Sequence, residues 1–264
     1  MMLSGISAPL LGLVDTAVMG HLDSPQFLAA VATGATIFNM LFMSLNFLRM
    51  GTTGMTAQAL GAGNTIKQLA GLQQPVLIAI VIAVLLILLQ APLLRIALIL
   101  LGPGPAVAEL TGQYFSIRIL SAPFALANFA IIGWLLGMQN ARGPLAIMLV
   151  LNLSNIAFDL VLVVGLGMTV DGVALATLLA EILALATGGF FVKTTLRDSG
   201  IHGPIVRWHG GEKIGRLVQV NGALFLRTLT LMFTFGFITA QGARLGDLTL
   251  ATNAVLMNFL FLLS

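Results

Sequence analysis

Cysteine is absent from the 264 residues, and charged side chains make up only 8% of them. The lack of cysteine excludes disulfides, thiolate metal sites and cysteine nucleophiles. A soluble domain carries roughly 25% charged residues, so this composition excludes a water-facing surface over most of the chain. The formal net charge of +3 comes without a basic stripe or an aromatic–basic platform, which argues against nucleic acid as a partner.

Motifs of soluble enzymes are missing as well. The sequence contains no Walker loop, no Gly-x-Ser-x-Gly elbow and no His-Glu-x-x-His. The three histidines are too scattered for a metal site: His21, His202 and His209. We therefore expect neither an enzyme nor a protein with an organic cofactor.

Long apolar runs dominate what remains, with 58% hydrophobic residues and a mean hydropathy of +1.05. About 20 consecutive apolar residues cross a bilayer as a helix. Because the runs are continuous rather than alternating, they predict helices and not a barrel. The sequence therefore predicts an all-α, polytopic membrane protein. The expected spans are 1–22, 27–50, 72–101, 107–139, 144–167, 171–194 and 214–241, with an eighth beginning around 249.

Several residues refine these spans. Pro92 and Arg95 indicate that the third run turns into an interfacial segment, and Pro123 predicts a kink in the fourth. Gly133 and Gly137 predict close helix packing. Three arginines are expected near span ends, where they either reach the membrane surface or pair with a carboxylate: Arg49, Arg118 and Arg227.

The polar connections predict the domain organisation and the orientation. Residues 195–213 read as a cytoplasmic linker between a six-helix lobe, 1–194, and the first helices of a second lobe, 214–264. Basic residues gather in one set of loops, which places that set and the N-terminus in the cytoplasm. That set holds Lys67, Arg142, Lys193, Arg197, Arg207, Lys213 and Arg216. The opposite set holds Arg244 with Asp23, Glu109, Asp171 and Asp247.

Three acids fall inside the expected spans, where an ionisable group is costly and therefore rare: Asp15, Asp159 and Glu181. At 1.5 Å of rise per residue, Asp15, Asp159 and Thr177 each lie about 10 Å below the outer surface. On the fifth helix Asn152, Asn155 and Asp159 share one face, because they stand at i, i+3 and i+7. Polar groups from three helices are thus expected at one level.

Carboxylate, amide and hydroxyl oxygens suit a hard cation such as Na⁺. Two carboxylates in a dry site also resist double ionisation, so one can hold a proton. Both H⁺ and Na⁺ stay open as the bound ion. Taken alone, Asn152 or Thr177 can be explained by structural hydrogen bonding between helices. Glu181 and Asn152 are therefore secondary candidates for the ion site.

Four segments resemble the multidrug and toxic compound extrusion (MATE) family, and its DinF branch in particular. The resemblance is carried by residues 9–22 (PLLGLVDTAVMGHL), 47–63 (FLRMGTTGMTAQALGAG), 135–139 (LLGMQ) and 242–246 (GARLG). It implies a twelve-helix antiporter of two six-helix lobes. Such a protein exports amphipathic or cationic organic compounds in exchange for H⁺ or Na⁺ across the plasma membrane, the inner membrane of a bacterium.

The resemblance also implies a site in the N-terminal lobe. The family's acidic first-helix residue corresponds to Asp15, its fifth-helix pair to Asn155 and Asp159, and its sixth-helix threonine to Thr177. Binding of a cation there would reshape the first helix, with Pro9 as the bend.

Length is the departure from that family, whose members continue through five further spans. The chain is therefore expected to hold the N-terminal lobe and the start of a C-terminal lobe that transport requires. Two other readings stay open: a flippase of lipid-linked precursors, and a half-transporter that does not transport alone.

Overall fold

The computed structural model describes residues 25–201 together with Gly222, Leu226 and Thr230. The chain divides into two compact units, residues 1–210 and 211–264, and the described residues of the second unit are helical. The expected first span, with Asp15 and Pro9, lies outside the described residues. So do most of the expected linker and most of the expected second lobe.

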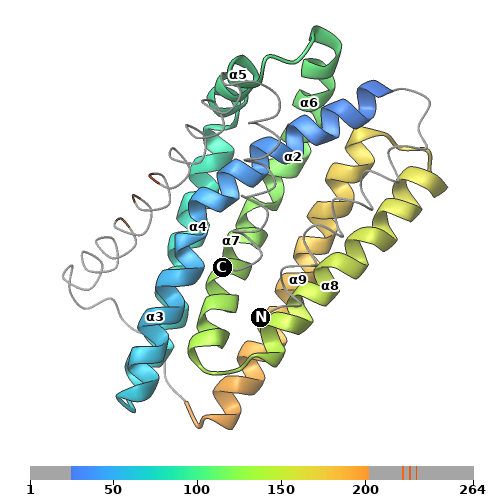
Figure 1. Ribbon diagram of the computed structural model, residues 1–264. Helices are drawn as coiled ribbons and strands as arrows, with labels where there is room; N and C mark the ends of the chain where they lie inside the picture. The colour runs from blue at the N-terminus through green and yellow to red at the C-terminus, as the bar shows by residue number, and fades with distance from the viewer. Residues whose placement is uncertain (1–24, 202–221, 223–225, 227–229, 231–264) are drawn as a thin grey trace, which may run out of the picture. The chain divides into compact units, whose positions relative to one another are not determined.

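Residues 25–201 form helices and turns without a strand, as the apolar runs predicted (Figure 1). Five helices in this range are long and apolar enough to cross a membrane, which confirms an all-α polytopic membrane protein. The elements are α2 (Pro25–Leu45), α3 (Phe47–Gly61), α4 (Thr65–Leu88), α5 (Gln90–Leu101), α6 (Pro105–Arg118), the 3₁₀ turn η1 (Ile119–Ser121), α7 (Ala122–Gly137), α8 (Arg142–Asp159), the π-helical segment η2 (Leu160–Gly165) and α9 (Val170–Asp198).

Several expected boundaries were wrong. The second span does not end at residue 50, because α2 and α3 together form one span, Pro25–Gly61. The third run begins earlier than expected, at Thr65, and the break predicted near Pro92 is confirmed, since α4 stops at Leu88 and the shorter α5 follows with Pro92 in its first turn. Proline is tolerated there because the first N–H groups of a helix have no intrahelical partner. Helix α9 runs past Thr195 to Asp198, into the range expected for the linker.

The predicted irregularity at Pro123 is confirmed in position. Helices α6 and α7 form a single span, Pro105–Gly137, interrupted by the η1 turn, which ends two residues before that proline. Arg118 therefore lies inside a span, and its expected position near a span end was wrong. The expected span 107–139 already contained Arg118 about three turns from its start, so the error was to treat that depth as a span end.

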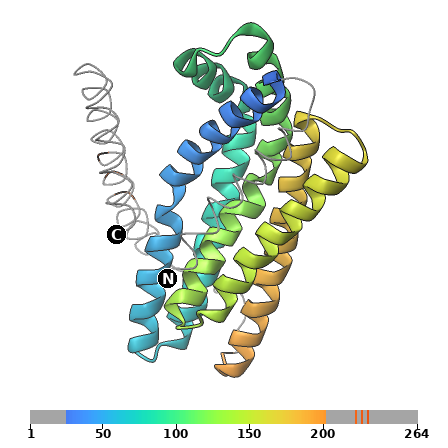
Figure 2. The same ribbon diagram turned by 45° about the vertical axis from the view of Figure 1, so that its right-hand side comes forward.

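Helix α7 packs against α3, α4 and α9 (Figures 1 and 2). A Cβ added to Gly133 would lie 2.5 Å from the Arg49 carbonyl oxygen, and one added to Gly137 would lie 2.5 Å from Thr56 Cβ. Both glycines thus allow the close α3–α7 approach that their spacing predicted. Trp134, between them, is fully buried and donates its indole N–H to the Gln68 carbonyl oxygen of α4 at 2.8 Å.

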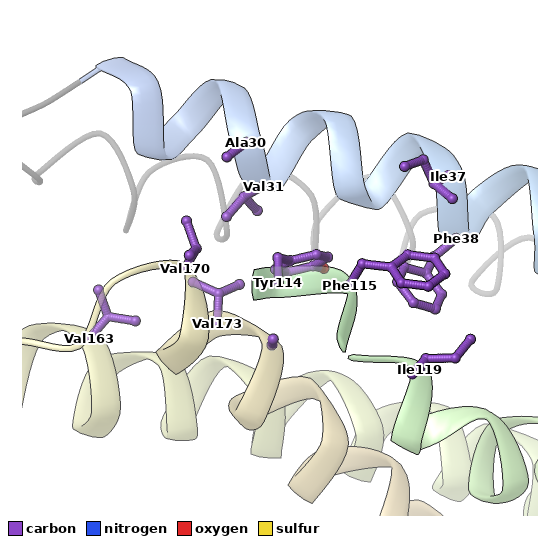
Figure 3. Close-up of a cluster of buried hydrophobic side chains, with 11 residues drawn as sticks. Ala30, Val31, Ile37, Phe38, Tyr114, Phe115, Ile119, Val163, Val170 and Val173 are labelled. Atoms are coloured by element: carbon purple, nitrogen blue, oxygen red, sulfur yellow. The ribbon is translucent and has the colours of Figure 1, made fainter. Parts of the chain in front are cut away.

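A hydrophobic cluster joins α2, α6 and α9, with aromatic rings from α2 and α6 and small aliphatic side chains from α9 (Figure 3). Phe38 of α2 lies 5.1 Å from the Phe115 ring and 6.3 Å from the Tyr114 ring of α6, measured between ring centroids. Gly34 leaves the room that Tyr114 occupies, because a Cβ at this position would collide with that ring. Aromatic pairs of this kind contribute about 1 kcal/mol each beyond their burial, so these rings stabilise the contact between α2 and α6.

Candidate functional site

Helices α8 and α9 lie side by side along most of their lengths (Figures 1 and 2). Asn155 and Asp159 stand one turn apart on the buried face of α8, with 1% and 0% of their surfaces exposed. Thr177 is buried on α9 with 4% exposed. The structure therefore brings three of the four predicted principal residues into one helix pair.

Asn155 and Thr177 are in direct contact. The Asn155 amide Nδ2 donates to Thr177 Oγ1 at 3.3 Å, and the threonine hydroxyl donates to the Val173 carbonyl oxygen one turn earlier at 3.1 Å. Asn155 Oδ1 is buried and accepts no hydrogen bond from the described residues. A buried carbonyl oxygen of this kind has a free lone pair, so Asn155 can still accept a proton donor or contact a cation.

Asp159 is the last residue of α8, and the backbone after it changes its winding. Residues Leu160–Gly165 form a π-helix, in which each turn takes one extra residue. Short π segments inside α-helices are found frequently at functional sites. The irregular segment therefore begins directly after the carboxylate that the sequence singled out.

The two secondary candidates separate in the structure. Asn152 is only half buried, at the edge of the face that carries Asn155 and Asp159. Glu181 lies one turn after Thr177 and is buried, with 9% of its surface exposed. Its hydrogen-bond partner is on α7, whereas the partner of Thr177 is on α8. Asn128 Nδ2 of α7 donates to Glu181 Oε2 at 2.9 Å and lies 3.3 Å from the Glu181 carbonyl oxygen.

Asn128, the hydrogen-bond partner of Glu181, was missed by sequence reasoning, and Arg118 was named but placed at the wrong depth. Asn128 is the only amide side chain in the otherwise apolar α7, and that isolation was a usable signal. Arg118 was assigned to a span end, yet it lies half buried in mid-span. Its Nη1 donates to the Tyr114 hydroxyl at 3.2 Å, and its guanidinium carbon is 5.3 Å from the centroid of the Phe38 ring.

The chemistry of the α8–α9 contact is that of hard oxygen ligands. A carboxylate, an amide oxygen and a hydroxyl lie on facing helices at membrane depth, which suits a proton or a hard cation. Residues 25–201 contain no cluster of three or more His, Cys, Asp or Glu side chains able to hold a metal ion. Asp15, the predicted fourth member, and Pro9 lie outside the described residues.

Fold and site together define a polytopic helical membrane protein with buried acids between its helices. The profile of the MatE family matches residues 1–161. The chain therefore belongs to the MatE family, which is a family of membrane transporters and not of enzymes. This confirms the resemblance carried by the first-helix and second-helix segments.

Individual relatives agree with this assignment. DNA damage-inducible protein F of Escherichia coli K12 is 48% identical over 262 residues, covering 98% of this chain and 57% of that protein. Multidrug export protein MepA of Staphylococcus aureus NCTC 8325 is 22% identical over 97% of this chain and 56% of that protein. The Vibrio cholerae MATE transporter VcmN, solved in its bent form, superposes with a TM-score of 0.82 at 23% identity, over 98% of this chain and 58% of VcmN.

At 23% identity, the similarity to VcmN is evidence for the fold alone. The chain spans less than two thirds of the length of each of these three proteins.

Proposed function

We propose that the full-length protein is a cation-coupled antiporter of the plasma membrane that exports small amphipathic or cationic organic compounds. The observation that carries the proposal is the buried α8–α9 contact, where Asp159 stands one turn from the Asn155–Thr177 hydrogen bond. An acid at membrane depth is costly to keep and typically marks an ion pathway. The name of MepA, a multidrug export protein, supports the class of cargo.

In the proposed mechanism Asp159 and Asp15 take up H⁺ or Na⁺, with Asn155 and Thr177 as neutral oxygen ligands. Neutralising a carboxylate removes its attraction for an organic cation, so ion entry and substrate release are linked. The first helix is proposed to bend at Pro9 as the ion binds. The buried carboxylates favour this exchange over the flipping of a lipid-linked pyrophosphate, for which a cationic cavity is expected.

The distribution of charge supports a cytoplasmic N-terminus. The ends of α3, α7 and α9 lie at one end of the bundle (Figures 1 and 2). Lys67 and Arg142 lie in the first turns after the α3 and α7 ends, and Lys193 and Arg197 are close to the α9 end. Excess Lys and Arg in short connections mark the cytoplasmic side, which puts the α8–α9 loop and the nearby Asp159 toward the outside.

The chain as given covers about the first half of such an antiporter. Alternating access in secondary transporters requires two bundles that move about a shared site. We therefore propose that transport needs the C-terminal lobe, and that residues 1–264 alone do not transport.

The test is Asp159→Asn in the full-length protein, with drug resistance and membrane abundance measured together. The substitution preserves size and removes the ionisable group, so we expect resistance to be lost while abundance stays unchanged. Asp198→Asn is the matched control, because this carboxylate is 69% exposed beside Arg197 and should change neither quantity. Full resistance in Asp159→Asn would refute the coupling role.

A further inference from the structure

Helix α5 is a separate element between two membrane spans. It begins two residues after α4 ends, and it stops at Gly102, which has a left-handed φ of 60° and donates its N–H to the Leu98 carbonyl oxygen. The 12 residues of α5 give about 18 Å of helix at 1.5 Å per residue, whereas the apolar core of a bilayer is about 30 Å thick. Helix α5 is therefore too short to cross the membrane. Figure 2 shows it turned out of the direction of α4, at the end of the bundle where α6 begins.

One side of α5 packs on the bundle. Leu93, Leu94 and Ala97 are partly buried against the hydrophobic cluster that joins α2, α6 and α9. A Cβ added to Gly112 of α6 would lie 3.7 Å from Leu94 Cδ2. No residue of α5 is fully buried, so the bundle covers this one side of the helix.

The opposite side of α5 is apolar along one edge and charged along the other. Ile96, Ile99 and Leu100 expose 56%, 74% and 79% of their surfaces. Successive residues of a helix are offset by about 100° around its axis, so Leu100 lies about 40° from Ile96. Arg95 is also exposed, and by the same count it lies about 100° from Ile96 and about 140° from Leu100. The cation is thus set apart from the most exposed apolar residues.

Arg95 has no anionic partner in the part of the chain that the structure describes. It is the one charged residue of α5, and the ion pair found in residues 25–201 joins Arg197 to Asp198 instead. A guanidinium beside an apolar helix face is stabilised when it reaches water or an anion at the membrane surface. The phosphates of phospholipid headgroups supply that anion.

We propose that α5 is an interfacial lipid-binding helix, with Ile96, Ile99 and Leu100 among the acyl chains and Arg95 on the headgroup phosphates. A short helix with an apolar and a cationic edge is stable in the plane of the interface, because each edge meets its own kind of surroundings. The two flanking spans hold α5 at this level. A cytoplasmic N-terminus makes this the outer leaflet, but the lipid contact rests neither on that orientation nor on the proposed transport function.

The depth of α5 is tested with nitroxide labels on single-cysteine variants of the full-length protein in phosphatidylethanolamine–phosphatidylglycerol liposomes. The 264 residues contain no cysteine, and any cysteine beyond them is first replaced by serine. Labels at Ile96→Cys and Leu100→Cys should be accessible to oxygen and lie about 5–10 Å inside the boundary between headgroups and acyl chains. The hydrocarbon control is Leu77→Cys, exposed midway along α4, which should lie about 15 Å inside. The aqueous control is Asp198→Cys.

Three results would overturn the proposal. Labels at Ile96 and Leu100 as accessible to a water-soluble nickel complex as the label at Asp198 would place α5 in water. Labels as deep as the one at Leu77 would place it in the hydrocarbon core. Labels that neither oxygen nor nickel reaches would show that protein covers this face, either the C-terminal lobe or a second copy.

The role of Arg95 is tested with a label at Ile99→Cys. Replacing the cation by Leu removes the group that prefers the headgroups, so we expect Arg95→Leu to move the label toward the depth of Leu77, while Arg95→Lys keeps it in place. An unchanged depth in Arg95→Leu would refute the contact between Arg95 and phosphate. Failure of Asp159→Asn to affect transport would instead refute the proposed function and leave these depths as they are.

Discussion

The α3–α7 contact and the α8–α9 contact both join membrane-length helices, but they use different side chains. At α3–α7, Gly133 and Gly137 bring backbone against backbone, with Thr52 and Thr56 alongside. At α8–α9 the Asn155 amide meets the Thr177 hydroxyl, and the buried Asp159 carboxylate stands one turn further along α8. Close packing is sufficient to hold helices together in lipid. Assembly therefore does not require the costly groups at α8–α9, and the proposed ion binding gives them a role.

Gly133→Leu tests the close packing of α3 against α7 and should have the largest effect. The new side chain would meet the Arg49 carbonyl oxygen and Thr52 Cβ, neither of which can move freely. We expect a loss of about 3 kcal/mol of stability, at the upper end for overpacking, seen as low membrane abundance. Gly54→Leu is the matched control, because a Cβ at this α3 glycine meets nothing within 4 Å. Equal abundance of the two variants would contradict the packing account.

Thr177→Val tests the polar α8–α9 contact and should have an intermediate effect. The substitution keeps the shape of the side chain and removes the acceptor of the Asn155 amide. An interhelical hydrogen bond in a membrane is worth about 1 kcal/mol, so unfolding should move only slightly while efflux falls. Thr187→Val is the control on the same helix, since its hydroxyl bonds only to the Leu183 carbonyl oxygen of its own helix. If both variants transport equally, Thr177 has no role in coupling.

The parts of this architecture that the sequence predicted are those set by helical periodicity. Asn155 and Asp159 share a buried face because they are four residues apart, and Gly133 and Gly137 share one for the same reason. The depth of Thr177 below its helix start predicted the level of Asp159, whereas its hydrogen bond is to Asn155, one turn earlier on α8. The shared faces can be predicted from the periodicity of a single helix.

Features that depend on how two helices are rotated against each other were not predicted. The partner of Glu181 could not be named, because any of several neighbouring helices could present a donor at that level. Arg118 was misplaced for another reason: the expected span 107–139 already contained it well inside the run, but it was treated as lying near a span end. The π-helix after Asp159 has no local signature in Leu160–Gly165, which is an ordinary apolar segment.

Asn152→Ala should have the smallest effect and tests the edge of the polar face. The side chain is half buried and lies one turn before Asn155. We expect a change in stability within about 0.5 kcal/mol and efflux near wild type, whereas Asn155→Ala should reduce efflux clearly. The two variants are compared in one growth assay under drug. A loss for Asn152→Ala as large as for Asn155→Ala would extend the site along α8.

The central claim is that the carboxylate in the α8–α9 contact couples an ion gradient to drug movement. It is tested most directly with full-length protein in liposomes, where a proton or a sodium gradient is imposed in turn and drug transport is followed. Wild-type protein should respond to at least one gradient, while Asp159→Asn should bind drug but respond to neither. Gradient-driven transport by Asp159→Asn at the wild-type rate would contradict the claim.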